Sequence, residues 1–249
     1  MVQNDLGEES LGYFQAAWVI SMTYIGFVLG AMGTDYFPRL AAVIQNHDQA
    51  NRLVNEQTEV AILLAGPVLL GMLALAPWVL QLLYSPEFAP AATVLRWQIL
   101  GDVLKVVSWP LGFITIAAGR GRLFMFTEAS AVAVFVLITW LALPAMGIEA
   151  TGVGFFAMYL FYLPLVFWFG YRRTGFRWTS IVLRDLAMLF ILAAITGAAG
   201  HWQDWLGAAV GLVAASAFGV MSLLRLARMA ELGGHLGKLA AAVRHILKS

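Results

Sequence analysis

The sequence predicts an all-α fold, a polytopic bundle of about seven transmembrane helices with interfacial amphipathic helices. The first observation is composition, since 61% of the 249 residues are hydrophobic and only 12% are charged. Soluble domains are nearer half apolar and a quarter charged. The other two observations are apolar runs of spanning length and an alternation of charge between the segments that join them. Apolar surface in this excess must face lipid.

Seven runs reach the length that a membrane span requires, which is about 20 mostly apolar residues. They cover residues 11–34, 60–83, 97–118, 123–143, 151–171, 181–199 and 205–224. The sixth run is the weakest because Arg184 and Asp185 lie near its start. Together the runs fill more than half of the chain.

Basic residues gather in alternate connecting segments, and this predicts an orientation. Cytoplasmic segments of membrane proteins collect Lys and Arg. If the runs alternate in direction, 13 of the 15 basic residues lie on one side. They are Arg39, Arg52, Arg120, Arg122, Arg172, Arg173, Arg177, Arg184, Arg225, Arg228, Lys238, Arg244 and Lys248. We therefore expect a periplasmic N-terminus and a cytoplasmic C-terminus. An outside N-terminus without a secretion signal leads us to expect the C-terminal part of a longer protein, or a truncated gene product.

Two segments outside the runs have the apolar spacing of amphipathic helices. Between the first two runs, an apolar stripe follows Pro38, a good first-turn residue, and stops at a break where Asn46 can cap the next helix. This predicts a pair of surface helices, the second continuing from residue 49 into the second run. After Gly234, apolar residues recur at helical spacing. That pattern predicts a helix lying flat on the anionic inner leaflet.

Three charged residues fall within or near the third run. Asp102 and Lys105 are three residues apart, so they share a helix face and can partly neutralise each other. Charged side chains inside a span usually face a cavity or the bundle interior. We expect the pair to line a substrate cavity, and the alternative is that it locks this helix to a neighbour. Arg96 lies farther toward the outer end, as a further cavity residue or a headgroup anchor.

Glu128 lies one turn into the fourth run, near the basic end. One interpretation is a surface pair with Arg120 or Arg122. The other is a protonatable group for ion coupling, a role for which Asp102 is also a candidate.

Small residues recur at helix-packing spacing in two runs, at Gly26 and Gly30 and at Gly207 and Gly211. This pattern lets helices approach closely and predicts packing rather than chemistry. Tryptophans mostly fall near the ends of the runs and predict an aromatic belt, with Trp109 the exception.

Several function classes are excluded or disfavoured. The chain has no cysteine, and His47, His201, His235 and His245 lack metal-ligand spacing, so we expect no metal site and no cofactor. No catalytic motif is present, and we assign no catalytic residue. The connections on the outer side are too short for a catalytic domain. The chain is predicted not to be an enzyme, and no feature indicates nucleic acid as a partner.

Several stretches resemble bacterial polysaccharide flippases of the Wzx type, which translocate O-antigen and enterobacterial common antigen units. This family belongs to the multidrug/oligosaccharidyl-lipid/polysaccharide exporter superfamily. The resemblance covers roughly residues 11–178, and the stretches that carry it are residues 11–16 (LGYFQA), 36–40 (YFPRL), 95–102 (LRWQILGD), 117–120 (AAGR) and 147–152 (GIEATG), with Tyr159 in an aromatic-rich span.

The resemblance implies a function in polysaccharide and lipopolysaccharide biosynthesis. Members move undecaprenyl-pyrophosphate-linked oligosaccharides across the inner membrane by alternating access, using two six-helix bundles around a cationic lumen. Lys105, and less directly Arg96, match the basic groups expected there, whereas Asp102 offsets Lys105. Residues 1–178 would be the C-terminal bundle, helices eight to twelve, with the first bundle absent. Residues 179–249 would be an additional transmembrane pair and a cytoplasmic amphipathic tail.

The implied location is the bacterial inner membrane, and the implied partners are the lipid-linked substrate, membrane lipids, other polysaccharide-assembly proteins and a missing N-terminal half. Three alternatives remain open. One is another exporter of the superfamily, for drugs or for lipid II. Another is a membrane glycosyltransferase, polymerase or ligase of polysaccharide assembly. The third is a truncated fragment that transports nothing.

Overall fold

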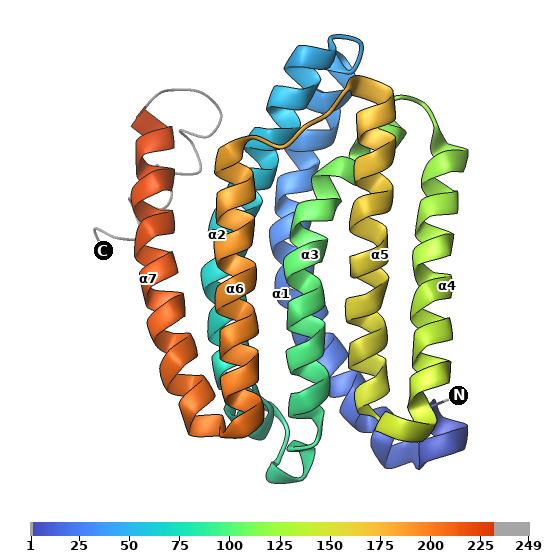
Figure 1. Cartoon of the computed structure of the whole chain (residues 1–249), viewed down its shortest axis with the longest axis vertical. Helices are drawn as coiled ribbons and strands as arrows, with labels where there is room; N and C mark the ends of the chain where they lie inside the picture. The colour runs from blue at the N-terminus through green and yellow to red at the C-terminus, as the bar shows by residue number, and fades with distance from the viewer. Residues whose placement is uncertain (1, 232–249) are drawn as a thin grey trace.

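The computed structural model describes the backbone of residues 2–231 and the side chains of residues 7–229. Within this part of the chain, seven long helices run up and down as a bundle (Figure 1). They are α1 (Val2–Val43), α2 (His47–Leu83), α3 (Ala91–Ala117), α4 (Gly121–Met146), α5 (Glu149–Thr174), α6 (Ser180–Trp202) and α7 (Asp204–Glu231). A short 3-10 helix, η1 (Pro86–Phe88), precedes α3.

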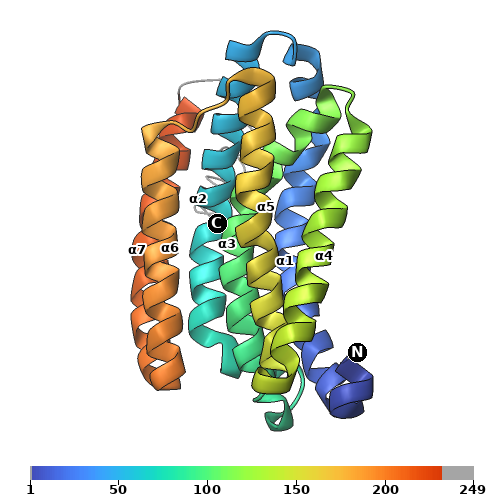
Figure 2. The same cartoon turned by 45° about the vertical axis from the view of Figure 1, so that its right-hand side comes forward.

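All seven helices of the described part are long and apolar enough to cross a membrane. Each corresponds to one of the seven predicted runs, so the predicted fold class is confirmed. The helix α3 lies inside the bundle, while α4 and α7 lie at opposite edges (Figures 1 and 2). The edge helix α4 accordingly presents large apolar side chains such as Phe126 and Leu141 to the surroundings.

The α1–α2 connection differs in part from the predicted pair of surface helices. Pro38 does not begin a new helix, because α1 continues through it to Val43. Leu40 and Ile44 are buried in a core cluster with Val54 of α2, so this end of the hairpin has its own apolar interior. The predicted cap is confirmed, since the side chain of Asn46 accepts a 3.2 Å hydrogen bond from the backbone N–H of Gln49. The amphipathic tail expected after Gly234 lies outside the described residues.

Glycines allow close helix packing at one of the two predicted pairs. A Cβ on Gly207 would lie 2.4 Å from Cα of Gly200, and one on Gly211 would lie 2.5 Å from Cβ of Ala74. The close packing within the α6–α7 hairpin and against α2 therefore requires glycine, which has no side chain, at positions 207 and 211. A Cβ on Gly26 or Gly30 of α1 would have no heavy atom within 4 Å, so the packing predicted for this pair does not occur among the described residues.

A charge cluster joins the α6–α7 hairpin to α2. The guanidinium of Arg225 in α7 donates hydrogen bonds to Asp185 of α6 and Glu59 of α2. Asp185 is fully buried and also accepts from Arg184, whose Nη2 lies 3.2 Å from its Oδ1. Of the two charges that weaken the sixth run as a sequence pattern, Asp185 is thus paired with Arg225 of the neighbouring α7, and Arg184 is paired with Asp185 itself.

The basic connections lie together at one end of the bundle. The α1–α2, α3–α4 and α5–α6 connections are all at the top of Figure 1, and they contain or adjoin the predicted arginine clusters. Glu87, Glu149 and Asp204 adjoin the connections at the other end. The N-terminus lies at that acidic end (Figure 2). The bundle therefore has one basic and one acidic end.

Candidate functional site

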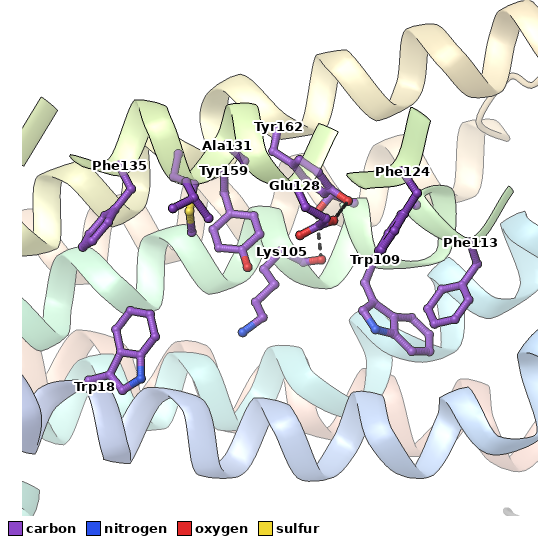
Figure 3. A pocket seen from close by; sticks show the side chains of 14 residues that line it. Trp18, Lys105, Trp109, Phe113, Phe124, Glu128, Ala131, Phe135, Tyr159 and Tyr162 are labelled. Atoms are coloured by element: carbon purple, nitrogen blue, oxygen red, sulfur yellow. Dashed lines mark hydrogen bonds between the residues drawn. The ribbon is translucent and has the colours of Figure 1, made fainter. Parts of the chain in front are cut away.

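A cavity of about 530 Å³ lies between α1, α3, α4 and α5. Aromatic and apolar side chains form most of its wall, and two charged residues, Lys105 of α3 and Glu128 of α4, reach it (Figure 3). The remaining lining residues are Trp18, Ser108, Trp109, Gly112, Phe113, Phe124, Ala131, Val132, Phe135, Met158, Tyr159 and Tyr162. An apolar pocket with a few polar groups is the usual form of a ligand site.

The rings of Trp109 and Phe113 form one end of the cavity wall. Their centroids are 4.7 Å apart, and the ring of Trp109 also packs on Tyr36 of α1. The hydroxyl of Tyr36 donates a 2.8 Å hydrogen bond to the carbonyl oxygen of Pro110. Gly33 leaves room for the Trp109 ring, because a Cβ there would lie 3.0 Å from it. Trp109 therefore lines the interior, as predicted, rather than a membrane interface.

Lys105 extends from α3 across the cavity toward α1 (Figure 3). Its Nζ lies 3.1 Å from Sδ of Met22 and 4.0 Å from Oδ1 of Asp102. It also lies 5.8 Å from the centroid of the Tyr159 ring. A thioether is a weak acceptor, and a 4.0 Å ion pair is a loose one. This amino group therefore keeps donor capacity for an anionic ligand.

Asp102 occupies a different place from the one expected. It is fully buried between α3 and α1, where the hydroxyl of Ser21 donates a 2.5 Å hydrogen bond to its Oδ2. It does not line the cavity that Lys105 enters. For Asp102 the geometry matches the alternative interpretation, a contact between neighbouring helices. Of the two residues, Asp102 is buried and Lys105 faces the cavity.

Glu128 accepts a hydrogen bond from the hydroxyl of Tyr162, which lies on α5. This contact replaces the expected pair with Arg120 or Arg122 and draws the carboxylate toward the cavity. In Figure 3 the side chains of Glu128 and Tyr162 lie beside α4 and α5, whereas the nitrogen of Lys105 points the other way, toward α1. Within the described residues no ion pair joins Lys105 to Glu128. The cavity thus contains one acidic side chain, Glu128, and one basic side chain, Lys105, which are not paired with each other.

Arg96 is not part of this cavity. Its Nη2 lies 2.7 Å from Oδ1 of Asp204, at the start of α7, and its guanidinium lies against Gly200 of α6. It lines a second cavity at the acidic end of the bundle. The structure therefore separates Arg96 from Lys105, although both come from α3.

Three lining residues do not stand out as site residues in the sequence. Trp18, Tyr159 and Tyr162 are aromatic residues inside apolar runs, where most aromatics serve packing. One feature of the sequence could have identified the two tyrosines. Tyr159 and Tyr162 are three residues apart in the same span, at a membrane depth similar to that of Lys105 and Glu128. Among the described residues no cluster of three or more histidines, aspartates or glutamates could hold a metal ion.

Comparison with known proteins finds partial similarity to proteins of polysaccharide biosynthesis and to flippases. A family described as polysaccharide biosynthesis protein matches residues 1–93, which include α1, α2 and the beginning of α3. The Lipid III flippases of Escherichia coli (strain K12) and Shigella flexneri are each 25% identical to the chain over 157 residues. The match covers 63% of this chain and 38% of each relative, so it spans well under half the length of these flippases. No solved structure matches the chain.

Proposed function

We propose that this chain takes part in moving an undecaprenyl-pyrophosphate-linked oligosaccharide, such as an O-antigen-type repeat unit, across the bacterial inner membrane. The observation that carries the proposal is Lys105, a basic side chain that reaches an apolar cavity between membrane helices with loose partners. The similarity to two Lipid III flippases supports the substrate class and favours a transporter over an enzyme.

The cavity has the chemistry that such a substrate needs. A pyrophosphate is attracted strongly to a cation at a site of low dielectric constant. Aromatic walls such as Trp18, Trp109 and Tyr159 offer flat apolar surface to sugar rings. Glu128 and Tyr162 add hydrogen-bonding groups for hydroxyls, and Glu128 is our candidate for the group that couples transport to an ion. In this proposal Asp102 orients Lys105 rather than binding substrate.

Alternating access requires a second moving body. We propose that α1–α5 form one bundle of the transporter and that α6–α7 are an additional pair beside it. The face of α1 that carries Gly26, Phe27 and Gly30 is exposed along the bundle, and Phe27 is 76% exposed. Small residues on such a face permit close helix contact. This face would meet a first bundle, with the basic end of the structure toward the cytoplasm.

Genetic complementation tests this function. The chain is expressed in a strain of Escherichia coli that lacks its Lipid III flippase, alone and together with the first bundle of that flippase. We expect surface polysaccharide to return when both parts are present. Accumulation of lipid-linked oligosaccharide in both cases, with the chain present in the membrane at normal level, would contradict the proposal.

A further inference from the structure

A groove between α5 and α6 contains a second cavity of about 340 Å³, on the other side of α3 from the first. Both helices flank α3 in Figure 1, and α3 forms the floor between them. The lining residues are Thr93, Arg96, Trp97 and Leu100 of α3, Glu149 of α5, and Ala194, Gly197, Ala198 and His201 of α6. This groove belongs to no part of the proposed transport site.

The groove is polar at one end and apolar along its length. Thr93, Glu149 and His201 lie near helix ends, whereas Leu100 and Ala194 lie deeper in the bundle. Along the apolar length the α6 wall bears only the small residues Ala194, Gly197 and Ala198, and a Cβ on Gly197 would meet only Leu100, at 4.0 Å. Space therefore remains open for a flexible hydrocarbon chain.

The polar end lies at the level expected for lipid headgroups. Trp202 and Trp205, at the α6–α7 turn beside His201, are 86% and 64% exposed. Tryptophans of membrane proteins concentrate at the boundary between lipid and water. A ligand with a polar head at this end and a chain along Leu100 has the arrangement of a membrane phospholipid.

The charges at the polar end select among phospholipids. Arg96 is paired with Asp204 at 2.7 Å, and Oε1 of Glu149 accepts a 2.7 Å hydrogen bond from the uncharged indole of Trp97. Within the described residues the guanidinium of Arg96 donates one hydrogen bond, from Nη2 to Asp204, so it has donor capacity left. One cation and two carboxylates give no net attraction for an anionic head. A zwitterionic head finds a cation for its phosphate and a carboxylate for its ammonium.

We propose that the groove holds one aminophospholipid of the phosphatidylethanolamine type. Its phosphate lies beside Arg96, its primary ammonium lies beside Glu149, and an acyl chain follows Leu100 between α5 and α6. The bound lipid fills the groove between the two helices.

Native mass spectrometry of the purified full chain tests this site. The delipidated protein is incubated with equal amounts of phosphatidylethanolamine, phosphatidylcholine and phosphatidylglycerol that have identical acyl chains. We expect one retained phosphatidylethanolamine, with about tenfold preference over phosphatidylglycerol because the anionic head meets two carboxylates. Equal retention of these two lipids would overturn the proposal.

Two variants and one control locate the bound lipid. Ala198→Trp fills the groove and should abolish retention, whereas Ala217→Trp adds the same ring to an exposed position of α7 and should leave it unchanged. The wild type should also retain phosphatidylethanolamine over phosphatidylcholine, because only a primary ammonium can donate hydrogen bonds to Glu149. Glu149→Gln keeps an acceptor for Trp97 but removes the charge, so this second preference should vanish. Wild-type retention by Ala198→Trp, or an unchanged preference in Glu149→Gln, would show that the lipid binds elsewhere.

Discussion

The hydroxyl of Ser21 donates a 2.5 Å hydrogen bond to the buried carboxylate of Asp102 and so joins α1 to α3. The other oxygen of Asp102 lies 4.0 Å from the Lys105 nitrogen. Asp102 therefore connects the packing of α1 on α3 with the position of Lys105, a basic side chain that lines the larger of the two cavities.

Ser21→Ala removes the donor and leaves the Asp102 carboxylate buried without it. A hydrogen bond to a charged group contributes about 1.5–3 kcal/mol, so we expect a loss of that size in the free energy of unfolding. Denaturant unfolding of the purified protein in detergent measures it. Thr23→Ala is the matched control, because among the described residues that exposed hydroxyl bonds only to the carbonyl of Val19 in its own helix. Equal losses in both variants would contradict the assigned role of Ser21.

Arg225→Gln breaks the cluster that holds the α6–α7 hairpin against α2. Removing one partner of a buried ion pair costs about 3–5 kcal/mol, because the other charge remains buried. We expect a clear drop in the unfolding midpoint, measured by thermal unfolding in detergent. Arg39→Gln, which removes an exposed pair with Asp35, should cost at most about 1 kcal/mol. A similar midpoint for both variants would show that the cluster does not stabilise the hairpin.

Alanine at two glycines should have opposite effects. Gly211→Ala places a Cβ 2.5 Å from Cβ of Ala74, and overpacking of this kind costs about 1–3 kcal/mol. Gly26→Ala meets nothing within 4 Å and should stabilise the isolated chain by about 0.5–1 kcal/mol, since Ala is the better helix former. The two unfolding free energies decide this, and a destabilising Gly26→Ala would show that α1 has a partner on that face in the isolated chain.

The hydropathy pattern alone predicts the seven helices, because the length of each apolar run determines which residues can enter lipid. It does not predict which helices are neighbours. The contact of Arg96 with Asp204 joins residues 108 positions apart, and Ser21 lies 81 positions from Asp102. The hydropathy pattern also does not predict how each helix is rotated about its axis. The sequence therefore could not predict that Asp102 lies at a helix interface while Lys105, on the same helix face, lines a cavity. Pro38 has the local signature of a helix start, yet α1 continues through it because Leu40 is buried against α2.

Cysteine labelling tests the proposed orientation. The chain has no cysteine, so Gln45→Cys and Gln203→Cys each introduce a single thiol at an exposed position at opposite ends of the bundle. If the basic end is cytoplasmic, a membrane-impermeant maleimide added to spheroplasts should label position 203 directly and position 45 only after permeabilisation. The reverse pattern would show that the chain is inserted the other way.

The most direct test of the central claim is the surface polysaccharide made by Lys105 variants in the complemented flippase-deficient strain. We expect Lys105→Ala to reduce it about tenfold or more, the effect of losing at least about 1.4 kcal/mol of interaction with an anionic substrate. Lys105→Arg should retain part of the activity, because it keeps the charge. Arg120→Ala, which removes an exposed charge in the α3–α4 turn, should behave as wild type. Wild-type polysaccharide from Lys105→Ala at equal protein level would contradict the assignment of Lys105 to the substrate.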